Sequence, residues 1–111
     1  KELPHVKQKS IDTANAVEML DGITRRTLTY NDDAMLCHIN LNKGSQIPLH
    51  NHPPVQIGMC VSGKIRFFGE NPEDEFTCTA GDGYVLESDK PHGADALEDS
   101  VVIERIEIQE S

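Results

Sequence analysis

Apolar and polar residues alternate along most of this chain with the period of two that is typical of β-strands. Short turn signals rich in Gly, Asn, Asp and Ser separate the alternating stretches, as in β-sandwiches and barrels. The all-β fold predicted by this pattern has strands in segments 23–30, 35–42, 55–70, 75–88 and 100–109, the third and fourth folded about turns at Ser62-Gly63 and Gly81-Asp82-Gly83. Segment 12–20, DTANAVEML, is compatible with a short helix instead.

Length and charge narrow the class of protein. The 111 residues suffice for one hydrophobic core but not for two, so we expect a single domain over residues 1–111. A formal net charge of −9 argues against nucleic acid or an anionic membrane as partner, because both attract basic surfaces. The chain shows neither an apolar run of about 20 residues nor the core of a signal peptide. We therefore expect a cytoplasmic protein whose partner is a small molecule.

The cysteines agree with that location. Cys37, Cys60 and Cys78 are odd in number, widely spaced and set in apolar stretches. A disulfide-stabilised domain would use an even and denser set. We expect buried, reduced thiols.

The sequence PLHNHPPVQ, residues 48–56, places two histidines two positions apart ahead of two prolines. His50, His52 and Gln56 share one parity, so a strand that resumes in register after the prolines would point all three to one face. Two imidazoles at this spacing can hold one cation with nitrogens about 2.0–2.1 Å from it. His92 is the candidate for a third ligand, because a barrel would bring it opposite. The alternative is a pair of solvated loop histidines.

The other two histidines are weaker candidates. His5 lies near the N-terminus, and we expect no role for it. His38 lies within MLCHINL, and we expect a hydrogen-bonded polar residue of a half-buried strand there rather than a ligand.

Two stretches together resemble the signature motifs of the cupins, which are small β-barrels. The first, residues 44–63, reads glycine, five residues, HxH, three residues, Gln56, six residues, glycine, and departs from the usual pattern only in having glutamine for glutamate. The second, residues 81–93, keeps its first glycine and its final Pro-His-Gly but lacks the central PxG. The resemblance implies a cupin-type double-stranded β-helix, or jelly-roll barrel, that binds a metal ion.

Within the cupins, the chain resembles the small members of pectin and alginate degradation, in segment 20–44, in the HxH with a glutamine and in KPHG. Those proteins open 4,5-unsaturated monouronates to the linear keto acid. The resemblance implies that His50, His52, Gln56 and His92 hold one divalent transition metal ion. The ligands alone do not choose among Zn, Ni, Fe and Mn. Where that family uses an aspartate, an aromatic residue and an arginine near its C-terminus, this chain has Glu104, Ile106 and Glu110.

Glu104 is the candidate catalytic residue. Its neighbours at even positions are apolar, so Glu104 is expected to face the interior, where burial would raise its pKa toward the range of a general acid or base. The alternative is a solvated glutamate on an edge strand. A substrate carboxylate could pair with any of three arginines, and the sequence does not choose among Arg25, Arg66 and Arg105.

These features predict a metal-dependent enzyme that acts on a small carbonyl or sugar acid by isomerisation, ring opening or proton transfer. Neutral ligands would leave the charge of the ion uncompensated and make it a strong Lewis acid. The alternatives are a non-catalytic cupin that binds a small ligand and an Fe(II) dioxygenase. We also expect a homodimer joined through N-terminal strands, because an exposed sheet edge otherwise promotes aggregation.

Overall fold

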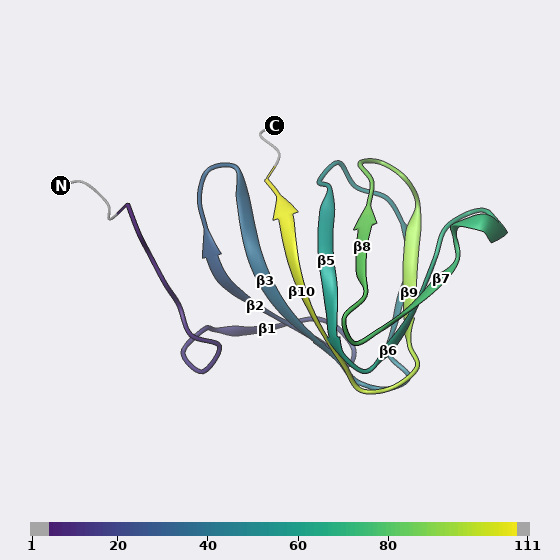
Figure 1. Cartoon of the computed structure of the whole chain (residues 1–111), viewed down its shortest axis with the longest axis horizontal. Helices are drawn as coiled ribbons and strands as arrows, with labels where there is room; N and C mark the ends of the chain where they lie inside the picture. Colours follow the sequence, from purple (N-terminus) through teal and green to yellow (C-terminus); the bar gives the residue numbers. More distant parts are fainter. Residues whose placement is uncertain (1–4, 109–111) are drawn as a thin grey trace.

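A computed structural model describes residues 5–108 of the chain. Their strands form two antiparallel sheets, one of six strands in the order β1-β2-β3-β10-β5-β8 and one of four in the order β4-β9-β6-β7 (Figure 1). The elements are β1 (Ala16–Leu20), β2 (Ile23–Tyr30), β3 (Ala34–Leu41), β4 (Gln46–His50), β5 (Gln56–Ser62), β6 (Lys64–Phe68), the 3₁₀ helix η1 (Pro72–Asp74), β7 (Phe76–Thr79), β8 (Gly83–Leu86), β9 (His92–Ala96) and β10 (Ser100–Glu107).

The all-β prediction is confirmed. β2 spans the predicted segment 23–30, and segments 55–70 and 75–88 each fold back at the predicted turns. At the first of these turns Gly63 has a φ of +88°, a conformation that favours glycine. The strands alternate between buried and exposed residues, most clearly in β10, because the two sheets face each other across the core.

The helix suggested for segment 12–20 is wrong. Residues 16–20 form β1 instead, which pairs antiparallel with β2 and places Val17 opposite Arg25. A helix of nine residues is marginal in water, whereas the edge of β2 offers the same backbone groups hydrogen-bond partners. All five residues of β1 are exposed, and the segment before β1 runs away from the barrel (Figure 1).

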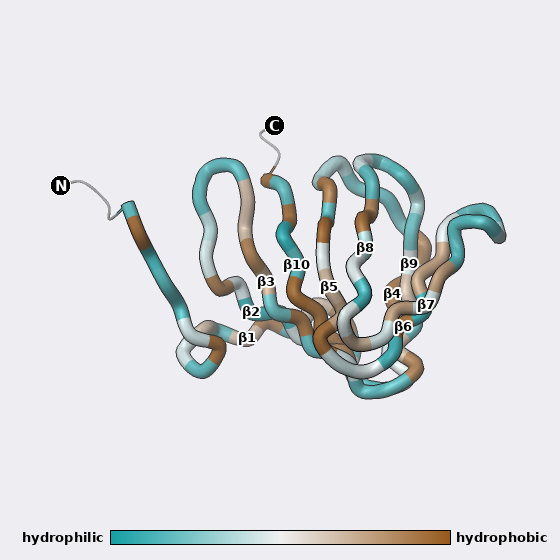
Figure 2. The backbone as a smooth tube through the Cα atoms, viewed as in Figure 1, coloured by the Kyte–Doolittle hydropathy of each residue, from teal (hydrophilic) through white to brown (hydrophobic). Residues whose placement is uncertain are grey.

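The core lies between the sheets. Its most buried side chains are Ile65, Cys37 and Cys60, each less than 2% exposed. All three cysteines are buried and free, as predicted, and burial raises the pKa of each thiol. Figure 2 shows hydrophilic residues concentrated in the β2–β3 turn and around η1, and hydrophobic residues along β3, β10 and β5. Within residues 5–108 no helix is long and apolar enough to span a membrane.

Candidate metal centre

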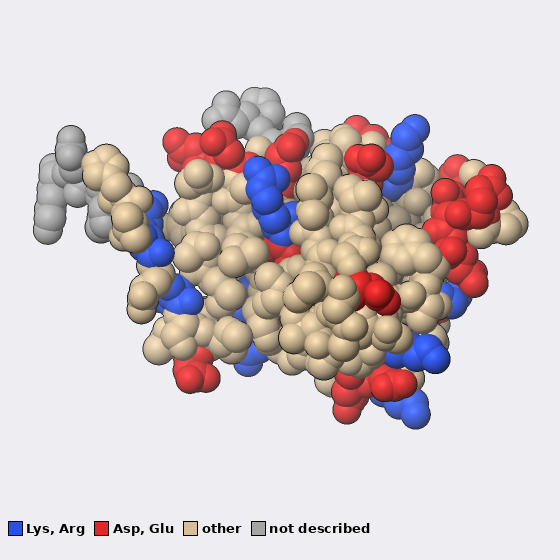
Figure 3. Space-filling view, in the orientation of Figure 1, with Lys and Arg blue, Asp and Glu red and all other residues tan. Residues whose placement is uncertain are grey.

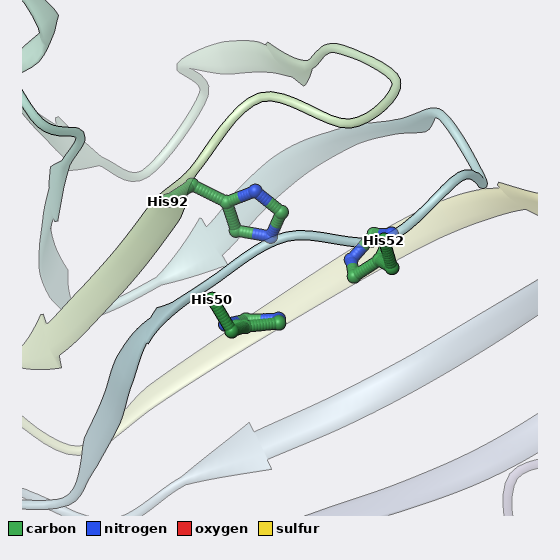
Figure 4. Close-up of side chains that lie close together, drawn as sticks. All are labelled: His50, His52 and His92. Carbon is green, nitrogen blue, oxygen red and sulfur yellow. The ribbon is translucent and has the colours of Figure 1, made fainter.

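Three histidines meet at one end of the barrel. His50 ends β4 and His92 begins β9, and the two residues are paired in the register between these strands. His52 follows in the loop after β4, so the strand does not run through as far as the prolines. The ring centroids are 4.6 Å apart for His50 and His92, 4.9 Å for His52 and His92, and 5.3 Å for His50 and His52. Figure 4 shows the three rings gathered around one point.

The backbone orients two of these rings. The Nδ1 atom of His50 lies 2.9 Å from the carbonyl oxygen of Pro48, and that of His92 lies 3.1 Å from the carbonyl oxygen of Lys90. A proton on each Nδ1 makes these contacts hydrogen bonds and leaves Nε2 as the lone-pair nitrogen. One ligand nitrogen from each of the three residues lies within 4.8 Å of the others, so the group could hold a metal ion.

Burial keeps His92 in the form that a metal requires. His92 is 8% exposed, and its burial lowers the pKa of the imidazole, an effect to which the neighbouring His50 and His52 add. A metal binds only the neutral ring. The Nδ1 atom of His52 is buried without a hydrogen-bond partner among the described residues, which fits a side chain that completes its contacts through a bound group.

Gln56 lies at the start of β5, beside the histidines in the lining of the same cavity. Its Nε2 donates a hydrogen bond of 2.8 Å to Glu104, whereas its Oε1 is buried and lacks a partner among residues 5–108. The donated hydrogen bond sets which way the amide points. A metal ion would satisfy the orphaned oxygen, so the residues present fit a metal held by three imidazoles and an amide.

Glu104 faces the interior, as its sequence neighbours predict, and is 4% exposed. One carboxylate oxygen accepts the hydrogen bond from Gln56, and the other accepts one of 2.5 Å from the Tyr84 hydroxyl. Burial raises the pKa of Glu104, and these two hydrogen bonds oppose the shift. The catalytic role of Glu104 stays a prediction.

Tyr84 is a residue that the sequence did not single out. Its burial raises the pKa of the phenol, so the hydroxyl remains a donor to Glu104. Gly58 on β5 lies opposite Tyr84 on β8 and opposite Glu104 on β10, and a Cβ at Gly58 would lie 2.6 Å from the Tyr84 hydroxyl. Because Gly58 has no side chain, the Tyr84 hydroxyl has room to reach the carboxylate of Glu104. The parity of β8 places Tyr84 inward, but its partner depends on the strand register.

A cavity of about 340 Å³ opens beside the histidines. Arg25 lines this cavity, as do Glu104 and Ile106. Arg66 instead pairs with Glu75 at 2.6 Å and with Asp95 at 2.5 Å, and the contact with Asp95 raises its pKa. Arg105 is exposed. Of the three candidate arginines, only Arg25 reaches the cavity.

The remaining candidates lie elsewhere. His5 is exposed and takes no part in the three-histidine group. His38 is half-buried, as predicted, but its Nδ1 has no hydrogen-bond partner among the described residues, so the prediction of a fully hydrogen-bonded side chain is wrong. Glu110 lies outside the described residues.

Comparison with solved structures supports the motif assignment. KdgF from Halomonas sp. superposes with a TM-score of 0.83 at 26% identity over 94% of this chain and 96% of that chain. An RmlC-like cupin from Shewanella frigidimarina has a TM-score of 0.80 at 20% identity over 96% of this chain and 97% of that one. A predicted oxalate decarboxylase from Thermotoga maritima has a TM-score of 0.70 at 18% identity over 87% and 93%. The last two show the fold alone.

Sequence comparison gives the family. No curated protein matches the chain significantly. A family model described as a cupin domain matches residues 37–104, more than half of the chain, and this range contains all four candidate ligands and Glu104. The two motifs, the barrel and this match agree, and the chain belongs to the cupin family.

Proposed function

We propose that this cupin is a metal-dependent enzyme that isomerises, or opens the ring of, a small carbonyl or sugar acid, with 4,5-unsaturated monouronates as the first substrate class to test. One observation carries the proposal. Three histidines that could hold an ion line the same cavity as a buried carboxylate. A Lewis acid and a proton-transfer group beside one small-molecule cavity are the two components that such reactions require.

Each residue has a distinct role in this proposal. His50, His52, His92 and Gln56 hold the ion, which when bound would polarise the oxygens of the substrate. Glu104 transfers the proton, because its burial raises its pKa and it lines the cavity. Tyr84 and Gln56 donate hydrogen bonds to its two oxygens and hold the carboxylate in place. The apolar walls exclude water and strengthen these interactions.

The test combines metal analysis with turnover. Purified protein is expected to carry one divalent ion per chain, and His50→Ala should retain less than about one-tenth of it. His38→Ala is the matched control, since His38 lies outside the group, and should retain the metal. Glu104→Gln should keep the metal but lose turnover of a 4,5-unsaturated monouronate, followed as loss of its double-bond absorbance. Unchanged metal content after removal of His50, His52 and His92 together would contradict the site.

A non-catalytic binding cupin is the second candidate, and one observation favours it. Both oxygens of Glu104 already accept hydrogen bonds, so the acid has less freedom to exchange a proton than a carboxylate with a free oxygen. Saturable binding of a uronate to the metal-loaded protein without turnover would support this candidate. Oxygen uptake by the Fe(II)-loaded protein would support a dioxygenase instead.

We also propose that the chain forms a homodimer in the cytoplasm. The outer patch, exposed apolar residues on the face of the six-stranded sheet turned away from the core, consists of Leu36, Ile57, Met59, Val61 and Val85. The unpaired edge of β1 adds further exposed apolar residues, and Figure 3 shows most of this face free of charged side chains. A second copy would cover both features. A monomeric mass in solution at micromolar concentration would contradict the dimer.

A further inference from the structure

Arg25 is a cation without a partner inside the cavity. It lies on β2, is half-buried and lines the cavity together with the three histidines. Among residues 5–108 its guanidinium makes no ion pair and no hydrogen bond, whereas Arg26 donates a side-chain hydrogen bond to Asn40, and Arg66 pairs with two carboxylates on the outside of the barrel. A half-buried guanidinium usually has a partner, because its five donors are costly to leave unsatisfied.

No other described residue in the cavity neutralises this charge. Glu104 is the only carboxylate that residues 5–108 contribute to the lining, and Tyr84 and Gln56 already donate hydrogen bonds to both of its oxygens. Most of the other lining side chains are apolar, including Ile39 and Ile47. A low dielectric strengthens the attraction between a guanidinium and an incoming anion, and the planar fork of arginine matches a carboxylate with two parallel hydrogen bonds.

The strand register separates Arg25 from the acid and the ligand Gln56. Arg25 is opposite Ile39 on β3, and Ile39 is opposite Val102 on β10, two residues before Glu104. Neighbouring strands lie about 4.8 Å apart, so β2 and β10 are separated by about 10 Å. We therefore expect a small molecule held by both Arg25 and the metal ion to carry its two binding groups at opposite ends.

We propose that Arg25 binds the carboxylate of the substrate, and that the ligand of this cavity is a small carboxylate with an oxygen-donor group at its other end that reaches the metal ion. The second half of this inference rests on the proposed function, because it needs the ion. The first half needs only the cavity and the unpaired guanidinium.

Two hydroxamic acids test the inference by isothermal titration of Zn(II)-loaded protein. Adipic monohydroxamic acid carries a chelating group at one end and a carboxylate at the other. Hexanohydroxamic acid has the same number of carbons but ends in a methyl group. The first compound is expected to bind at least tenfold more tightly than the second. Arg25→Gln should remove this preference, and Arg26→Gln, the neighbouring arginine hydrogen-bonded to Asn40, should keep it.

Each outcome decides between the parts of the proposal. If the wild-type protein binds both compounds equally, or if Arg25→Gln keeps the tenfold preference, Arg25 is not the carboxylate anchor, although the metal site stands. The wild-type comparison alone decides this even where Arg25→Gln fails to fold. If neither compound binds, the metal site is wrong, and titration of the metal-free protein with hexanoate then tests the anchor directly. Binding that Arg25→Gln abolishes supports the anchor, and no binding overturns it.

Discussion

The two faces of the six-stranded sheet differ in an unusual way. On the inner face, β5 and β10 present Gln56 and Glu104, which are hydrogen-bonded to each other. On the outer face, the same β5 presents Ile57 and Met59, which are 51% and 45% exposed. A sheet with one face toward solvent usually carries apolar residues inward and polar residues outward. Near the candidate site, this sheet does the reverse.

The difference shows what each face contacts. Buried polar groups are tolerated where they find partners, and Glu104 finds two within the barrel. Exposed apolar groups in a contiguous patch indicate a surface that another molecule covers. The polar groups of the inner face therefore find their partners within one chain, except for Arg25 and the ligand atoms of the candidate metal centre. In the proposed homodimer, a second chain would cover the outer patch, which lies on the largely uncharged face in Figure 3.

The largest expected effect lies on the inner face. Gly58→Ala would place a Cβ 2.6 Å from the Tyr84 hydroxyl and 2.8 Å from the backbone oxygen of Ile103, which cannot move without breaking the sheet. We expect the free energy of unfolding to fall by about 3 kcal/mol. Gly83→Ala, on the neighbouring strand, is the control, because its Cβ would meet nothing closer than 3.6 Å. Urea denaturation of both variants measures the difference, and equal losses would show that the contact between Gly58 and Tyr84 is not tight.

The next effect lies on the outer face. Met59→Lys would place a charge in the centre of the outer patch, and we expect it to weaken dimerisation about 30-fold, the effect of losing one strong interface contact. Metal content should not change, since Met59 points away from the cavity. Leu97→Lys is the control, an exposed apolar residue outside the patch. Analytical ultracentrifugation over a range of concentrations measures the constant. A dimer that Met59→Lys leaves intact would place the interface elsewhere.

The sequence predicted the fold and the three histidines for a physical reason. Alternation reports which face of a strand a residue occupies, and it placed Glu104 inward without any knowledge of the residues that Glu104 contacts in the fold. To predict that the HxH motif and His92 come together, it was enough to assume that the strands close into a barrel, which pairs His50 with His92. These features depend on local pattern and general architecture.

Other features depend on the strand register and on packing, which a single sequence does not report. The hydrogen bond from Tyr84 to Glu104 exists because Gly58 lies between them. Arg25 reaches the cavity and Arg66 does not, although both lie in strands with a similar pattern. The strand at residues 16–20 forms because β2 offers an edge, and helix propensity alone favoured the wrong structure.

A smaller effect is expected when the charge next to Glu104 on the inner face is changed. Gln56→Glu would replace the donor to Glu104 by a second carboxylate within hydrogen-bond distance. In metal-free protein we expect a loss of about 1–2 kcal/mol at pH 7. Two adjacent carboxylates raise their folded pKa values, so this pair stabilises the protein below the unfolded pKa and the stability is lost as pH rises.

With metal bound, Gln56→Glu is expected to stabilise the protein instead of destabilising it. A carboxylate ligand should hold the ion more tightly than the amide, while the lower net charge makes the ion a poorer Lewis acid and reduces turnover. Gln46→Glu is the control, because Gln46 is exposed on β4. Thermal denaturation with and without metal, at pH 5 and pH 7, separates the two effects. A Gln56→Glu protein that turns over a uronate as fast as the parent would show that the neutral ligand is not needed.

The smallest expected effect concerns a polar residue on the outer face. His38 lies on β3 opposite Arg26 and Ile103, and its Nδ1 is buried without a partner among the described residues. Burial lowers the pKa of His38, and the nearby Arg26 lowers it further. The folded chain therefore favours the neutral ring, so this contribution to stability is present above the unfolded pKa of about 6.5 and is lost as pH falls through the folded pKa.

Because the side chain of His38 is only half-buried, we expect this effect on the free energy of unfolding to be below about 0.5 kcal/mol. It is measured by urea unfolding of the zinc-loaded parent and of zinc-loaded His38→Gln, as the difference between the two proteins at pH 7.5 and at pH 5.5. Both proteins carry the same three histidines at the candidate site, so any contribution from these histidines cancels in this difference. If the difference does not change with pH, His38 is solvated in the folded protein.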